Sequence, residues 1–106
     1  MLTKITFKKM DSSNALKKYI KKKLGKFDKM LDSPADAHVV LSIEKIRCIA
    51  EIKLTCDKLR IHAKEDSAKM RSSIDALIDK VKTQITKHKQ KVRRHISKNK
   101  KSIKHN

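Results

Sequence analysis

Hydrophobic and polar residues first alternate along the chain and then recur with a helical period. The alternation over residues 2–8 predicts a strand. Over residues 13–31, apolar residues recur every three or four positions, so at about 100° per residue they form one stripe of an amphipathic helix. Several residues over 11–14 can cap this helix, and Pro34 ends it because proline disfavours helical geometry in the residue before it. The stripe consists of Leu16, Ile20, Leu24, Phe27 and Leu31.

Three more stretches with strand-like alternation follow, over residues 38–44, 47–55 and 58–64. The connections between them, near Lys45-Ile46 and Cys56-Asp57, are short enough for hairpins, so the three strands are expected to form an antiparallel meander. Neither connection contains Asn-Gly or Asp-Gly, which leaves the turn types open.

The last element is a long amphipathic helix. Asp66 or Ser67 can cap its start, and its helical pattern runs to about His95. Residues 96–106 contain two isolated isoleucines among Lys, Asn, Ser and His, so we expect a disordered basic tail there. The apolar stripe of the helix consists of Met70, Ile74, Leu77, Ile78, Val81, Ile85 and Val92.

The resulting order, βαβββα, predicts an α+β fold in which a four-stranded sheet has two helices packed on one face. If the first two strands are parallel neighbours, the crossover between them is expected to be right-handed. The sequence contains no internal repeat, so we expect one domain over residues 1–95 followed by the tail over 96–106.

The chain has 106 residues with 29 Lys or Arg and 11 Asp or Glu, which gives a formal net charge of +18. No apolar run approaches the roughly 20 residues that span a bilayer, and a secretory signal is not expected at the start. A small folded domain with this charge is expected to bind a polyanion. Nucleic acid is favoured over an anionic membrane surface, because both predicted helices use their apolar stripes against the sheet.

The cations gather on the two predicted helices. From residue 80 to 106 there are eleven Lys or Arg and no acid, whereas solvated faces usually mix both signs. With the helices side by side, their cationic rows are expected to form one continuous surface with a groove between them. One flank of the second helix has Lys80, Lys87, Lys91 and Arg94, the other has Lys82, Lys89 and Arg93, and the outer side of the first helix has Lys18, Lys22, Lys26 and Lys29.

No motif supports catalysis, a metal or a cofactor. The sequence has no Gly-rich phosphate loop, nucleophile elbow or paired-carboxylate motif. Cys48 and Cys56 have the same parity on one strand and are interpreted as small core residues in a reduced protein. His88 and His95 can share a helix face but lack the neighbours that would complete a metal site. We therefore expect a binding protein and not an enzyme.

Aromatic residues are scarce, which narrows the binding mode. Phe7, Tyr19 and Phe27 are the three present, and both phenylalanines belong to the predicted core. Proteins that read single strands stack bases on aromatic rings, so that mode is disfavoured. Binding through phosphates and helical shape fits the lysine rows better.

A set of short segments is distributed along residues 1–95. The most specific is Leu77-Ile78-Asp79-Lys80 running on to Lys87-His88-Lys89-Gln90-Lys91. The others are Ala15-Leu16-Lys17-Lys18-Tyr19-Ile20 with Lys23-Leu24, His38-Val39-Val40-Leu41 with Glu44-Lys45, Ile61-His62-Ala63, and Met70 with Ile74-Asp75. Together these segments resemble the ribosome hibernation-promoting factors in their short, single-domain form.

The resemblance implies a βαβββα fold reminiscent of double-stranded-RNA-binding domains. It also implies binding to the rRNA of the small ribosomal subunit, in the channel that mRNA and tRNA normally occupy, which blocks translation in stationary phase. The implied protein is cytoplasmic, ribosome-associated and a monomer when free, and it uses no cofactor, membrane or small-molecule substrate. The implied RNA contacts are Lys22, Lys26, Lys29, Lys80, Lys87, Lys89 and Lys91, with Lys18, Arg93 and Arg94 added from helix geometry.

Three features depart from the family pattern. Met70-Arg71-Ser72-Ser73 stands where the family usually has Met-Tyr, so Arg71 is either one more phosphate contact or a plain surface residue. The dimerisation domain of the long form is absent, so ribosome pairing is expected to need a separate ribosome modulation factor. Residues 96–106 are basic, whereas a related factor that keeps ribosomes single has an acidic extension, and this favours the pairing-promoting type.

The alternative function is that of a nucleoid-type protein that binds DNA without sequence specificity. Such a protein shares the charge and the lack of base-reading aromatics. It is disfavoured because no arm or wedge residue is placed for insertion into a minor groove.

Overall fold

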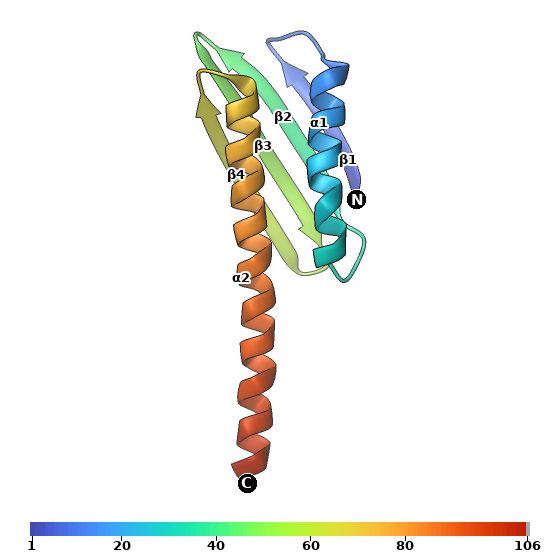
Figure 1. Ribbon diagram of the computed structural model, residues 1–106, viewed down its shortest axis with the longest axis vertical. Helices are drawn as coiled ribbons and strands as arrows, with labels where there is room; N and C mark the ends of the chain where they lie inside the picture. Colours follow the sequence, from blue (N-terminus) through green and yellow to red (C-terminus); the bar gives the residue numbers. More distant parts are fainter. Residues whose placement is uncertain (106) are drawn as a thin grey trace.

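The computed structural model describes the backbone of residues 1–105 and the side chains of residues 1–91. Its elements follow the predicted order βαβββα, with one short 3₁₀ segment added, and Figure 1 shows both helices on the same face of the sheet. The elements are β1 (Leu2–Lys8), α1 (Asn14–Gly25), η1 (Lys26–Met30), β2 (Asp36–Glu44), β3 (Arg47–Cys56), β4 (Leu59–Ser67) and α2 (Met70–His105).

The four strands lie in the order β1-β2-β3-β4. β1 is parallel to β2, and β2, β3 and β4 form the expected antiparallel meander. The register places Ile5 beside Val39, Val39 beside Ile52, and Ile52 beside Ala63. Because side chains alternate between the two faces of a sheet, these four side chains form one row across the sheet, on the face that the helices cover.

The core lies between the sheet and the two helices. It takes Ile20 and Leu24 from α1, Phe27 from η1, and the inward residues of β2, β3 and β4. From α2 it takes four residues of the predicted apolar stripe, which are Ile74, Leu77, Val81 and Ile85. The apolar stripes of both helices are therefore used against the sheet, which leaves their charged sides to the solvent.

The first helix is divided where the sequence predicted one continuous helix over 13–31. Ser13 caps α1, with its hydroxyl accepting a hydrogen bond from the Leu16 N–H at 3.2 Å, and the α-helix ends at Gly25. The 3₁₀ segment η1 follows. Because side chains three residues apart eclipse in a 3₁₀ helix, η1 can turn both Phe27 and Met30 toward the core.

The second helix differs from the prediction at both ends. It starts at Met70, and Asp66 does not cap it but pairs with Arg47 at 2.9 Å. It continues to His105, about ten residues beyond the end expected near His95. No glycine or proline follows Pro34 in the chain, so nothing in the sequence interrupts the helical backbone once the apolar stripe has ended. The boundary of the functional domain at residue 95 stays a prediction.

The long second helix gives the molecule its shape. Figure 1 shows α2 extending well beyond the end of the sheet, and the molecule measures 61 × 23 × 17 Å. Its first turn is held by Ser73, which is fully buried and donates a hydrogen bond to the Cys48 carbonyl at 2.6 Å. Within the described part of the chain, no helix is both long and apolar enough to cross a membrane.

Candidate nucleic-acid interface

The two faces of the sheet differ in charge balance. The face away from the helices, here called the open face, carries six cations, Lys4, Lys8, Arg47, Lys53, Arg60 and Lys64, and four acids, Asp36, Glu44, Glu51 and Asp66. Several are paired: Arg47 with Asp66 at 2.9 Å, Glu51 with His62 at 2.6 Å, and Glu44 with Lys9 at 3.8 Å. The open face is thus a mixed surface of the kind that solvated faces usually show.

The helical layer holds most of the excess positive charge. α1 and η1 together have seven lysines and one aspartate, and residues 70–91 of α2 have six cations and two aspartates. The row predicted on the outer side of the first helix is exposed to solvent throughout. It consists of Lys18, Lys22, Lys26 and Lys29.

One cationic row of α2 faces β4. Lys80 extends to Glu65 of β4, with Nζ 2.7 Å from the carboxylate oxygen. Lys87 and Lys91 follow on the same flank and line a hollow together with Leu59 of β4. We call Lys80, Lys87 and Lys91 the β4-side strip.

The other row of α2 faces α1. Asp75 accepts a hydrogen bond from Tyr19 of α1, and Lys82 and Lys89 follow Asp75 at seven-residue spacing on the same flank. Lys89 lines a pocket with Met30 of η1. The flank of α2 that carries Asp75, Lys82 and Lys89 therefore faces α1, a choice that periodicity alone does not make.

Arg71 and Lys23 complete the surface between the helices. The Arg71 guanidinium lies 4.6 Å from the centroid of the Tyr19 ring, and the Lys23 Nζ lies 5.5 Å from it. Both distances are within the range of cation–π interactions. We call Lys23, Arg71, Lys82 and Lys89 the interhelix strip.

The Tyr19 hydroxyl is perturbed by this environment. Its hydrogen bond to Asp75 is the main reason that the pKa of Tyr19 is raised, with partial desolvation and the negative charge of Asp75 acting in the same direction. Arg71 opposes the shift through its positive charge. Tyr19 therefore stays protonated and can keep donating to Asp75.

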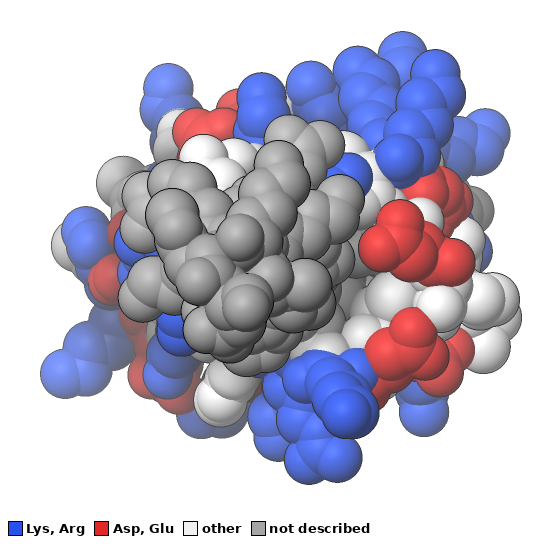
Figure 2. Space-filling view, turned by 90° about the horizontal axis from the view of Figure 1, so that it is seen from below, with Lys and Arg blue, Asp and Glu red and all other residues white. Residues whose placement is uncertain are grey.

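The expected single cationic surface is instead divided in two. Between the β4-side strip and the interhelix strip, the solvent side of α2 presents Ser72, Asp79, Thr83 and Gln90, none of which is a cation. Around the molecule as a whole, seen from the C-terminal end of α2, lysine and arginine side chains also form separate groups, with acidic side chains between two of them (Figure 2). The predicted contacts Lys80, Lys87 and Lys91 thus lie on one strip, and Lys89 lies on the other.

The predicted set of RNA contacts did not include Lys23 or Lys82, and it left Arg71 open as either a phosphate contact or a plain surface residue. The four-residue spacing of Arg71 from Asp75 places both residues on one side of the helix. Arg93 and Arg94 belong to the predicted set, but their side chains lie outside the described residues. Among the described residues, no three His, Cys, Asp or Glu side chains gather closely enough to hold a metal ion.

Comparison with known proteins places this geometry among ribosome-associated factors. The family model described as Sigma 54 modulation protein / S30EA ribosomal protein matches residues 3–93. The ribosome hibernation promoting factors of Klebsiella oxytoca and Escherichia coli (strain K12) are each 33% identical to the chain over 91 residues, which is 86% of this chain and 96% of the relative.

Two solved structures superpose on this chain. The Thermus thermophilus Protein Y N-terminal domain superposes with a TM-score of 0.79 at 27% identity, covering 83% of this chain and 99% of that domain. A ribosomal subunit interface protein from Coxiella burnetii superposes with a TM-score of 0.76 at 26% identity, covering 85% of this chain and 99% of that protein.

Proposed function

The chain belongs to the sigma 54 modulation protein / S30EA ribosomal protein family, and we propose that it is a hibernation factor that binds the rRNA of the small ribosomal subunit. It occupies the channel that mRNA and tRNA use, and it blocks translation in stationary phase by excluding them. The protein acts in the cytoplasm as a monomer until it binds, and it catalyses no reaction.

The separation of charge between the two layers is the observation that carries this proposal. Acids pair with cations on the open face, whereas the helical layer keeps a large excess of lysines exposed. Exposed cationic strips with few aromatic side chains suit the phosphate backbone of folded RNA, which supports binding mainly through phosphates. The contacts are Lys18, Lys22, Lys26, Lys29, Lys80, Lys87, Lys89, Lys91, Arg93 and Arg94.

The bound ribosomes are proposed to form inactive dimers together with a separate ribosome modulation factor. The basic composition of residues 96–106 supports this type of activity over one that keeps ribosomes single. Sedimentation of whole ribosomes with this protein, with and without the modulation factor, tests it. Particles heavier than single ribosomes are expected only when both proteins are present.

Co-sedimentation with purified small subunits in sucrose gradients tests the binding site. Replacing the β4-side strip by Lys80→Glu, Lys87→Glu and Lys91→Glu should move the protein to the top of the gradient. The matched control changes three open-face lysines, Lys4→Glu, Lys53→Glu and Lys64→Glu, which alters the net charge equally and should leave the protein with the subunits. Circular dichroism verifies that both variants are folded.

Two results would contradict the proposal. Equal release of both variants would mean that net charge, and not the helical layer, controls binding. Binding of the unaltered protein to duplex DNA as tight as to small subunits at matched salt would favour the nucleoid-type alternative. In either experiment affinity should fall steeply with salt, because neutralising about 6–10 phosphates releases counterions.

A further inference from the structure

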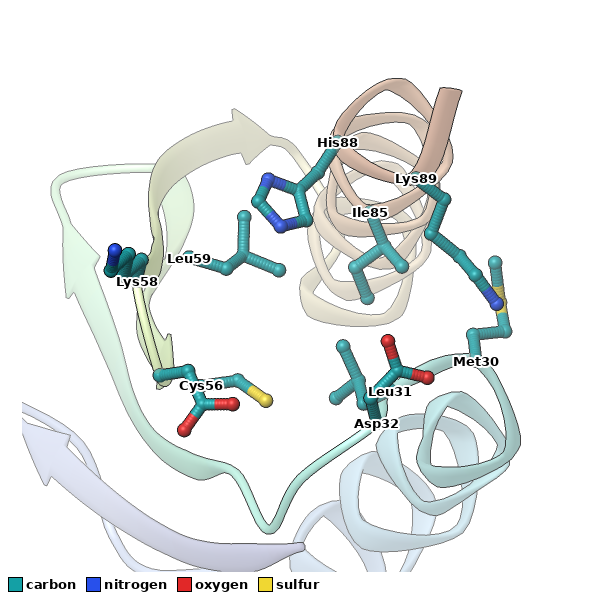
Figure 3. A pocket seen from close by; sticks show the side chains of 10 residues that line it. Met30, Leu31, Asp32, Cys56, Lys58, Leu59, Ile85, His88 and Lys89 are labelled. Atoms are coloured by element: carbon teal, nitrogen blue, oxygen red, sulfur yellow. The ribbon is translucent and has the colours of Figure 1, made fainter. Parts of the chain in front are cut away.

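A pocket of about 580 Å³ lies where α2 leaves the sheet. It is bounded by the residues that follow η1, by the connection between β3 and β4, and by α2 (Figure 3). Its walls are largely apolar and consist of Leu31, Cys56, Leu59 and Ile85. This volume is typical of sites for small organic groups, and apolar walls with a few polar side chains are their usual lining.

Five polar side chains line this apolar space, and Asp57 is one of them. The His88 ring points from α2 into the pocket beside Leu59, and the Asp32 carboxylate is directed toward Ile85 from the opposite side (Figure 3). Lys58 and Lys89 lie at its margins. The pocket therefore offers a flat ring, two carboxylates and two cations around an apolar centre.

Of the two carboxylates that line the pocket, Asp57 already has a partner among the described side chains and Asp32 does not. Asp57 accepts a hydrogen bond from the Ser33 hydroxyl at 2.5 Å, and the Cys56 thiol donates to the Ser33 carbonyl at 3.2 Å. No side chain that the structure describes pairs with the Asp32 carboxylate. A ligand in the pocket can therefore donate to Asp32 without displacing an existing bond.

We propose that this pocket binds one unpaired guanine base of the RNA, an inference that rests on the proposed function. The base lies between the His88 ring and the apolar wall opposite it, and its N1–H and N2–H groups donate to the two oxygens of Asp32. Its backbone phosphate lies near Lys58 or Lys89. Guanine fits best because it alone among the four bases presents two adjacent donors to a carboxylate on its pairing edge.

The phenylalanine and tyrosine rings of the chain are less suited to this task. Phe27 is buried in the core, and Phe7 packs against the core with Lys17 over its ring. The Tyr19 ring has Arg71 and Lys23 over it. An acyl chain in the pocket would make no hydrogen bond with the Asp32 carboxylate, so the polar lining favours an occupant that has donor groups.

Binding of the full chain to short RNAs tests the proposal. Fluorescence anisotropy compares the pentamer UUGUU with UUAUU and with a pentamer that has an abasic centre. The guanine pentamer should bind at least about fivefold more tightly than the abasic one, since stacking of one base contributes about 1–3 kcal/mol. His88→Ala should remove most of this difference, and Asp32→Asn should remove the preference for guanine over adenine.

Matched controls separate the pocket from general effects of charge and helix stability. Asp79→Asn changes the charge as Asp32→Asn does, and Thr83→Ala truncates an exposed side chain of α2, so both variants should keep the guanine preference. In NMR spectra, guanosine monophosphate should shift the methyl signals of Leu59 and Ile85, whereas inorganic phosphate should not.

The outcomes distinguish this proposal from the proposed function. Equal binding of the guanine and abasic pentamers, or equal methyl shifts with phosphate alone, would overturn the guanine pocket. Both measurements are made without ribosomes. Failure of the unaltered protein to sediment with small subunits would overturn the proposed function instead, and it would be seen in a separate experiment.

Discussion

The hydroxyl of Tyr19 on α1 donates a hydrogen bond to the carboxylate of Asp75 on α2. This bond joins the two helices through residues that are 56 positions apart in sequence. Together with Arg71 over the Tyr19 ring, it closes one end of the interhelix strip and sets how far Lys23 lies from the cations of α2. Tyr19 therefore helps to fix how the cations of α1 and α2 lie relative to one another.

Replacing Tyr19 by phenylalanine keeps the ring and removes only the hydroxyl. We expect Tyr19→Phe to lower the free energy of unfolding by about 0.5–1.5 kcal/mol, the usual net contribution of one hydrogen bond. Urea denaturation measures the loss. Asp75→Asn provides the second arm of a double-mutant cycle, and simple additivity of the two losses would contradict the proposed coupling.

The raised pKa of Tyr19 predicts that the stability of the protein depends on pH in the alkaline range. A group whose pKa is higher in the folded state contributes stability that is complete below its unfolded value of 10.0 and is lost as the pH rises through the folded value. The unaltered protein should therefore lose stability above pH 10 more steeply than Tyr19→Phe. Denaturation curves at several alkaline pH values provide the measurement, and parallel curves would contradict it.

The lowered pKa of Glu51 predicts that the stability of the protein depends on pH in the acid range. A hydrogen bond with His62 lowers the pKa of Glu51 from 4.5, with the charges of His62, Lys64 and Lys53 acting in the same direction. A lowered pKa contributes stability above pH 4.5 that is lost as the pH falls through the folded value. Glu51→Gln should flatten the acid limb of the stability curve. Urea denaturation at several acidic pH values measures this, and parallel curves for the two proteins would contradict it.

The connection between β2 and β3 holds Lys45 in left-handed geometry. Its φ of 55° is unfavourable for a residue with a Cβ atom, whereas glycine adopts it readily. Lys45→Gly should therefore raise the free energy of unfolding, by up to about 1 kcal/mol. Ile46→Gly, at the next position of the same turn, should not. A melting temperature of Lys45→Gly below that of the unaltered protein would contradict the expectation.

The ion pair between Lys80 and Glu65 predicts that removing the charge of Glu65 strengthens binding to small subunits. An RNA phosphate must compete with the Glu65 carboxylate for the Lys80 ammonium group. Glu65→Gln should therefore raise the affinity for small subunits by a few-fold at low salt and steepen the salt dependence by up to about one phosphate contact. Glu51→Gln makes the same charge change on the open face and should have little effect. Equal effects of the two variants would remove Lys80 from the interface.

The elements of this fold were readable from local patterns, because each helix and strand buries one face against a shared core. The stripe from Ile74 to Ile85 and the alternation along β2 are direct consequences of helical and strand geometry. The boundaries were less readable. The division of the first helix at Gly25 and the continuation of α2 to His105 depend on packing and on the absence of helix breakers, neither of which periodicity records.

The arrangement of the cations on the two helices was decided by tertiary structure alone. The sequence established that lysines flank both apolar stripes, but a helix has two flanks and periodicity does not say which of them meets the neighbouring helix. That choice follows from contacts between distant residues, Tyr19 with Asp75 on one side and Lys80 with Glu65 on the other. The pocket beneath His88 likewise forms only where three segments meet, because its walls come from residues more than fifty positions apart.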